Sequence, residues 1–146
     1  MNTDKKLQAP SVCHCYHLRR ASRAVTQFYD DMLAPSGLKV TQYSLLNHIR
    51  RLGPLTMNEL SQAMRLERTT LLRNLKPLEK LGYVTVLPGK NSQARQLSLT
   101  EKGLEVLAVA APHWEEAQQK LAKLFKPEEL QGLLSSLSKL ESLSMK

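Results

Sequence analysis

The chain has 146 residues, of which 42% are hydrophobic and 23% are charged, a composition typical of a single folded unit. Its 21 Lys and Arg residues outnumber 13 Asp and Glu residues, and the resulting net charge of +8 is compatible with a polyanion as partner. Aromatic residues make up only 5%, which disfavours a base-stacking platform, and no apolar run is long enough to span a membrane, so we expect a cytoplasmic protein.

The N-terminal part of the chain predicts a tail followed by a long helix. Residues 1–10 are polar and indicate a flexible tail. Ser11 is placed to cap a helix that runs to about Ala34, where Pro35-Ser36-Gly37 ends it. Apolar side chains repeat every three or four residues along this helix, so it should carry an apolar seam.

Two shorter helices are predicted next. Thr41 is positioned to cap a helix from Gln42 to Leu52, with Gly53-Pro54 as its stop. The segment Thr56-Met57-Asn58-Glu59 matches a capping box and predicts a helix from Met57 to Met64.

A fourth helix and a hairpin follow. The helix should begin at about Glu67, which can cap it, and end at Lys80 before Gly82. Residues 83–87 and 95–99 alternate like strands around a loop rich in turn formers, which predicts a two-stranded hairpin.

The C-terminal part predicts two more helices with apolar faces. One carries a stripe from Leu104 to Leu124, with a bend expected at Pro112. The other opens at Lys126-Pro127 with acidic residues in its first turn, and leucines line one side of it. The predicted fold is therefore mainly α, with a small β-hairpin.

Two helices joined by a tight turn and followed by a hairpin predict a winged helix-turn-helix over residues 37–100. Helical spacing places Leu71, Leu75 and Leu78 on the inner side of the second helix. The outer side then carries hydroxyl, amide and cationic groups, which suit the base edges and phosphates of a major groove. The predicted DNA-binding residues are Arg65, Arg68, Thr69, Thr70, Arg73, Asn74, Lys76, Lys90 and Arg95.

The positive charge is concentrated in the same segment. Residues 47–102 contain ten Lys and Arg against four Asp and Glu, whereas the rest of the chain has eleven against nine. This distribution favours duplex DNA as the partner.

The sequence resembles the multiple-antibiotic-resistance regulators (MarR), a family of winged-helix transcription factors. The resemblance covers about Val12 to Leu124. The segments that carry it are Leu18-Arg19-Arg20-Ala21, Gly37-Leu38-Lys39-Val40-Thr41-Gln42-Tyr43-Ser44-Leu45-Leu46, Arg68-Thr69-Thr70-Leu71-Leu72-Arg73-Asn74-Leu75, Leu81-Gly82-Tyr83-Val84 and Leu99-Thr100-Glu101-Lys102-Gly103.

This resemblance implies a homodimer whose N- and C-terminal helices, within residues 11–36 and 101–146, interlock. Each subunit would place one recognition helix in a major groove of a pseudo-palindromic operator, and the expected role is repression. The family's wing commonly carries Asp and, two residues later, an Arg that enters the minor groove. Asn91 and Gln93 occupy those positions here, and Arg95 is the residue that can substitute.

The motif Cys13-His14-Cys15-Tyr16-His17 has three interpretations. A metal site is disfavoured because residues two apart on a helix diverge by about 200°, which also disfavours a disulfide. Redox sensing is one alternative, because the hydroperoxide-sensing branch of the family has a reactive cysteine where Cys15 stands. A tyrosine that hydrogen-bonds this thiol corresponds to Tyr29, which would reach Cys15 from the partner subunit. Ordinary packing of both cysteines in a dimer interface is the other alternative.

The family's other signal is a small aromatic or phenolic ligand bound between the dimerisation helices and the winged helix. Tyr16, Arg20, Tyr43 and His48 are the candidate residues for such a site. No cofactor is expected. An enzyme is disfavoured because the chain has no phosphate loop or nucleophile elbow, and a helical interaction module that does not bind DNA is the remaining alternative.

Overall fold

The computed structural model describes residues 12–144, so the predicted tail and the predicted cap at Ser11 lie outside the described residues. Its helices are α2 (His14–Leu33), α3 (Val40–Leu52), α4 (Met57–Met64), α5 (Arg68–Lys80), α6 (Glu101–Ala122) and α7 (Pro127–Glu141). Its strands are β1 (Leu55–Thr56), β2 (Val84–Leu87) and β3 (Gln96–Leu99), and its short 3-10 turns are η1 (Ala34–Ser36), η2 (Ser92–Ala94) and η3 (Ser142–Ser144). The predicted mainly α fold with a small β wing is confirmed.

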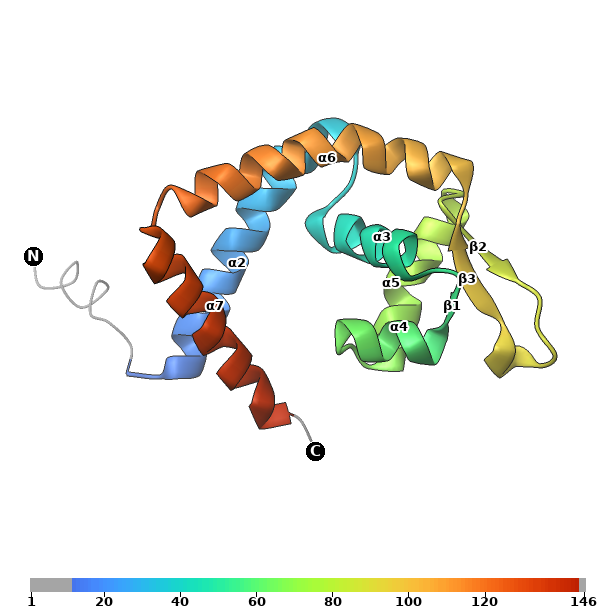
Figure 1. Ribbon diagram of the computed structural model, residues 1–146, viewed down its shortest axis with the longest axis horizontal. Coiled ribbons are helices and arrows are strands. Elements are labelled where there is room, and N and C mark those ends of the chain that lie inside the picture. Colours follow the sequence, from blue (N-terminus) through green and yellow to red (C-terminus); the bar gives the residue numbers. More distant parts are fainter. Residues whose placement is uncertain (1–11, 145–146) are drawn as a thin grey trace, which may run out of the picture.

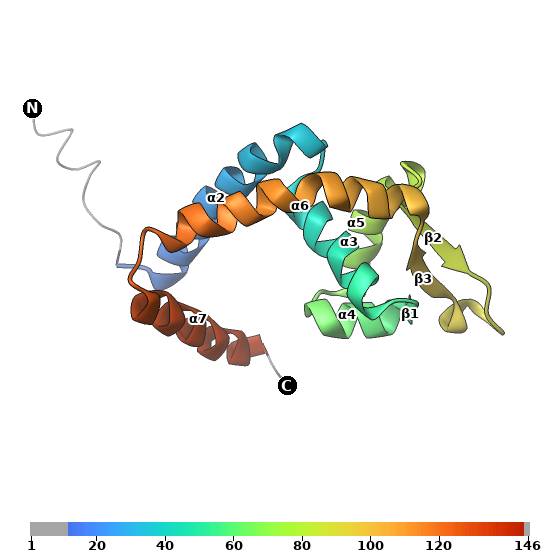
Figure 2. The same cartoon turned by 45° about the horizontal axis from the view of Figure 1, so that its top comes forward.

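The molecule has two halves joined by α6, which runs along the top like an arch (Figure 1). Helices α2 and α7 lie at one end of α6, and α3, α4, α5 and the sheet lie at the other (Figures 1 and 2). Helix α6 continues through Pro112 as one helix. Within residues 12–144, no helix combines the length and apolar character needed to cross a membrane.

The hydrophobic core lies in the half that contains the sheet. Leucines from α3, α4 and α5 are almost completely buried there, together with Leu55 of β1, Val84 of β2 and Leu97 of β3. By contrast, no described residue of α7 is buried, although leucines line one of its faces. The two halves therefore differ in how much apolar surface one subunit covers by itself.

The sheet has three strands in the order β1-β3-β2, with antiparallel pairing throughout. The predicted hairpin corresponds to β2 and β3. Strand β1 was not expected because two residues are too few to show an alternating pattern. Its Leu55 pairs with Leu97, which ties the segment before α4 to the base of the wing.

Of the N-caps predicted for α3 and α4, the structure confirms one and contradicts the other. The capping box before α4 is confirmed, because the backbone N–H of Glu59 donates to Oγ1 of Thr56 at 3.2 Å. Thr41 is not the cap of α3, which begins at Val40. Instead, Oδ1 of Asp30 accepts the N–H of Val40 at 2.8 Å, a contact from α2 that local spacing does not reveal.

The base of the wing is held against α6 by Thr100. Its hydroxyl donates to the carbonyl oxygen of Gly82 at 2.5 Å and accepts the N–H of Gly103 at 3.0 Å. A side chain at Gly103 would collide with the carbonyl oxygen of Tyr83, so glycine permits this close approach. The wing is therefore fixed in position relative to the first turn of α6.

Candidate DNA-binding surface

Helix α5 has the two faces that the sequence predicts. Leu71, Leu75 and Leu78 are at most 1% exposed and anchor the helix in the core. The opposite side is open to solvent, with Thr70 and Asn74 half-buried at its edge. Within residues 12–144 the guanidinium of Arg73 forms no ion pair, so it is available for an anionic or base-edge partner. The exposed residues of this face are Arg68, Thr69, Arg73, Lys76 and Lys80.

Arg68, at the start of this face, and Arg65, just before α5, differ in their surroundings. Nη1 of Arg68 lies 3.5 Å from Oδ1 of Asn58 at the start of α4, and its side chain remains exposed. Arg65 ends α4 in the left-handed conformation, with φ of 52°, and pairs with Glu141 of α7 at 2.5 Å. Arg65 therefore has a carboxylate partner within its own chain, unlike Arg73.

The wing presents Lys90 and Arg95 to solvent on either side of η2. Oδ1 of Asn91 accepts the N–H groups of Gln93 and Ala94 at 3.0 and 2.9 Å and so caps this turn. The side chain of Gln93 is exposed. The residue at the family's Asp position thus shapes the wing tip, while the position of the usual arginine carries a neutral amide.

The structure adds residues of α3 to this surface. Lys39 and Thr41, both exposed, line a small polar hollow of about 110 Å³ together with Arg73 and Asn74. Sequence reasoning did not place them there because they lie more than thirty residues before Arg73, although a lysine just before a helix was a usable signal.

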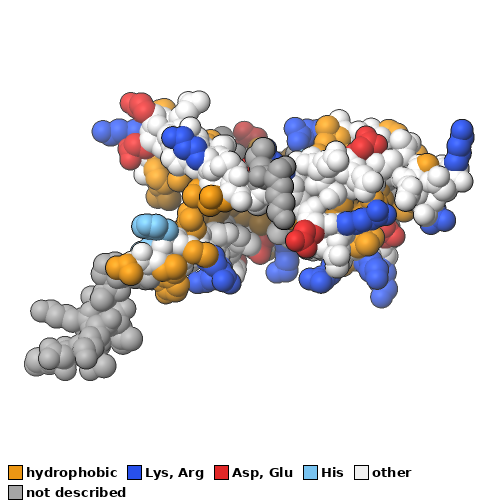
Figure 3. All heavy atoms as spheres, turned by 90° about the horizontal axis from the view of Figure 1, so that it is seen from below, with side chains coloured by type: hydrophobic (Ala, Val, Ile, Leu, Met, Phe, Trp, Pro, Cys, Tyr) orange, Lys and Arg blue, Asp and Glu red, His pale blue; other side chains and the backbone are white. Residues whose placement is uncertain are grey.

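Cationic and apolar side chains are unevenly distributed in this view, although both kinds occur in each half (Figure 3). Seen from below, blue Lys and Arg side chains recur across the half that contains α3, α4, α5 and the wing (Figure 3). Orange hydrophobic side chains are prominent around α2 and α7 at the other end (Figure 3). The arrangement fits a polyanion-binding half and a half with uncovered apolar surface.

The four candidate ligand residues are not brought together within one subunit. Tyr43 is buried and its ring stacks on Trp114 with centroids 5.7 Å apart, so it belongs to the packing between α3 and α6. Nδ1 of His48 lies 2.7 Å from the carbonyl oxygen of Ser44 on the same helix. Tyr16 and Arg20 are exposed near the start of α2. Within one chain these residues do not line a common cleft, and their role in a ligand site of the proposed dimer stays a prediction.

Cys13 and Cys15 are both exposed thiols. Cys13 is the N-cap of α2 and is extended rather than helical, so the argument that helical geometry separates the two cysteines does not apply. Both line a surface hollow of about 380 Å³ with Tyr16, Arg19 and Arg23. Among residues 12–144, no group of three or more His, Cys, Asp or Glu is placed to hold a metal ion.

The hydroxyl of Tyr29 already has a hydrogen-bond partner within its own chain. Tyr29 is buried, which raises the pKa of its hydroxyl, and this hydroxyl donates to Oε1 of Gln118 on α6. The hydrogen bond joins α2 to α6 within one chain. The Tyr29 hydroxyl could donate to a thiolate of another subunit only if this bond broke, although it could still accept a hydrogen bond from a thiol.

The fold is that of a winged helix-turn-helix DNA-binding protein. Its two helices are α4 and α5, with one face of α5 buried in the core, and its wing is the β2–β3 hairpin. Residues 36–95 match the model of the MarR family. The uncharacterized HTH-type transcriptional regulator YwoH of Bacillus subtilis (strain 168) is 30% identical over 107 residues, which cover 70% of this chain and 78% of YwoH. The chain belongs to the MarR family of transcriptional regulators.

Solved structures show the same fold. The M. tuberculosis transcriptional regulator MosR in complex with DNA is 35% identical, with a TM-score of 0.78 and coverage of 91% of this chain and 99% of MosR. The S. aureus MepR–DNA complex also has a TM-score of 0.78, with coverage of 90% and 98%, but its 20% identity supports the fold alone.

Proposed function

We propose that this protein is a homodimeric repressor that binds a pseudo-palindromic DNA operator through α5 and the wing. The observation that carries the proposal is the exposed face of α5, where Thr69, Arg73 and Lys76 stand above three buried leucines. Bases in the major groove are read by such hydrogen-bonding groups, and phosphates are neutralised by such cations. Lys39 and the wing residues Lys90 and Arg95 extend the contact along the DNA backbone.

The uncovered apolar surface of the helical half supports the dimer. Leu134 is 57% exposed and Leu124 is 78% exposed in the single chain. A cavity of about 520 Å³ lies among α2, α6 and α7, and Leu133, Leu134 and Leu137 contribute to its lining. A second copy of the chain would remove this surface from water, which stabilises the assembly.

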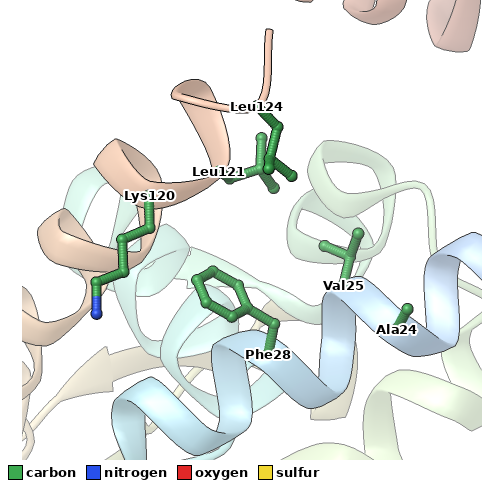
Figure 4. Close-up of a pocket in the computed structure, with 6 residues that line it drawn as sticks. All are labelled: Ala24, Val25, Phe28, Lys120, Leu121 and Leu124. Carbon is green, nitrogen blue, oxygen red and sulfur yellow. The ribbon is translucent and has the colours of Figure 1, made fainter.

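A second apolar cavity of about 270 Å³ lies between α2 and the end of α6. Val25 and Phe28 of α2 point toward Leu121 and Leu124 across it, and Lys120 stands at one side (Figure 4). Nζ of Lys120 is paired with Glu116 at 3.3 Å. The remaining lining is almost entirely aliphatic or aromatic, which favours helices of a partner subunit as its occupant.

The proposal is tested by selecting operators from a random DNA library and measuring affinity as a function of salt. We expect one dominant site with two half-sites about 34 Å apart, one helical turn of DNA. A dimer that neutralises six or more phosphates should lose roughly 1,000-fold in affinity between 50 and 200 mM salt. Weak binding that is independent of sequence and nearly insensitive to salt would instead support the helical interaction module.

Among the possible signals that release the protein from DNA, the surroundings of Cys15 favour oxidation of its thiol. Cys15 lies in the first turn of α2, exposed, in a hollow that also contains Cys13 and two arginines. Reactive cysteines occupy such accessible, positively charged surroundings. In the proposed step, the Cys15 thiolate attacks an organic hydroperoxide, which leaves as the alcohol while the sulfur becomes a sulfenic acid.

Replacing Cys15 with serine is expected to abolish release by cumene hydroperoxide, because the hydroxyl is not oxidised under these conditions. A band-shift assay with wild type should show loss of the DNA complex upon addition of peroxide and recovery with a thiol reductant. The Cys15→Ser complex should persist at the same peroxide concentration. Equal release of both proteins would rule out Cys15 as the sensor, and Cys13→Ser measured in parallel shows whether Cys13 takes part.

A further inference from the structure

An exposed apolar side chain lies at the edge of the polar outer surface of α5. Leu72 is 45% exposed, although Leu71 and Leu75 on the same helix are at most 1% exposed. Residues three and four apart are surface neighbours on a helix. Leu72 therefore has Arg68 and Thr69 on one side and Lys76 on the other, all of them exposed, and it also neighbours the buried Leu75.

Docking of α5 in a major groove would take Leu72 out of water together with its polar neighbours. An apolar group gains from this only if it meets another apolar group; beside a polar base edge it would hinder hydration without making a hydrogen bond. The apolar group that a base edge presents in the major groove is the C5-methyl of thymine. Leucine thus has one well-matched partner on this surface of the DNA.

We propose that Leu72 determines specificity by contacting a thymine methyl group in each half-site. This inference rests on the proposed DNA-binding function and adds a base preference that hydrogen bonds from Thr69 and Arg73 do not provide. The contact reads thymine without a hydrogen bond, so it distinguishes thymine from cytosine and also from uracil.

The experiment uses the full-length protein and its selected operator, in which each thymine is replaced in turn by deoxyuridine, which lacks only the methyl group. We expect one symmetry-related pair of thymines whose replacement weakens wild-type binding by about 3- to 10-fold. The Leu72→Ala variant should bind the unmodified operator as weakly as wild type binds the modified one. It should also be insensitive to replacement at that pair.

The matched control is Leu81→Ala, because Leu81 is 47% exposed but follows the end of α5. This variant should retain the full deoxyuridine penalty. Circular dichroism melts of both variants should resemble wild type, since neither leucine belongs to the core. If an operator is selected but no deoxyuridine penalty disappears in Leu72→Ala, the inference is overturned while the DNA-binding function stands. If no operator is selected, the proposed function itself fails and the inference falls with it.

Discussion

Replacing Arg73 with alanine should reduce affinity for the selected operator by at least roughly 30-fold. Arg73 is exposed on α5 and has no ion-pair partner among residues 12–144, so its guanidinium is available to a guanine edge or a phosphate. One bidentate contact to a base discriminates by about 1–3 kcal/mol, and a dimer loses two such contacts. Fluorescence anisotropy at fixed salt would measure the loss, and operators with single base changes would show relaxed specificity.

Two variants serve as controls for Arg73→Ala. Lys123→Ala removes one positive charge beyond the end of α6, in the other half of the molecule, and should change affinity little. Gln93→Ala alters the exposed wing position where relatives commonly have arginine, and should also have a small effect. Equal losses for Arg73→Ala and Gln93→Ala would show that the wing contributes as much as the recognition helix, contrary to our proposal.

Replacing Leu134 with lysine should convert the protein from dimer to monomer and reduce operator affinity by roughly 100-fold. Leu134 is 57% exposed on α7, so the single subunit loses little when it is replaced. In the proposed dimer the same position is buried, and an unpaired ammonium group is costly there. A monomer has only one recognition helix, so it loses the gain in affinity that two linked binding sites provide. This gain is commonly about 100-fold or more. Sedimentation velocity and anisotropy measure the two effects.

The control is Ser135→Lys, one residue further along α7. Helical spacing places Ser135 on the side opposite the leucines, where it is exposed. This variant adds the same charge to the same helix and should remain dimeric. A Leu134→Lys protein that still sediments as a dimer would show that the face of α7 with Leu134 is not the interface.

The elements governed by local spacing could be predicted from the sequence. The period of Leu71, Leu75 and Leu78 identified the buried side of α5, and therefore the side that carries Arg73. The Thr56–Glu59 capping box located the start of α4 because both partners lie within four residues of each other. These features require no knowledge of distant segments.

The features that sequence reasoning missed depend on contacts between distant segments. Asp30 stabilises the start of α3 from another helix, and Tyr43 is held by Trp114, seventy-one residues later in the chain. The pairing of Leu55 with Leu97 creates a strand too short to have a pattern. An exposed or buried assignment for Tyr43 likewise depends on where α6 passes, which the local sequence does not specify.

Helix α6 connects the two halves of the subunit mechanically. It runs without interruption for 22 residues, which corresponds to about 33 Å. Thr100 fastens one end to the base of the wing, and the Tyr43–Trp114 stack fastens its middle to α3. If α6 tilted by about 6° about its C-terminal end, its N-terminal end beside the wing would move by about 3.4 Å. This is the spacing of one base-pair step. In the proposed dimer, a signal at the helical end would therefore need no refolding of the winged helix, because a small change of angle would move the two recognition helices out of register with their half-sites.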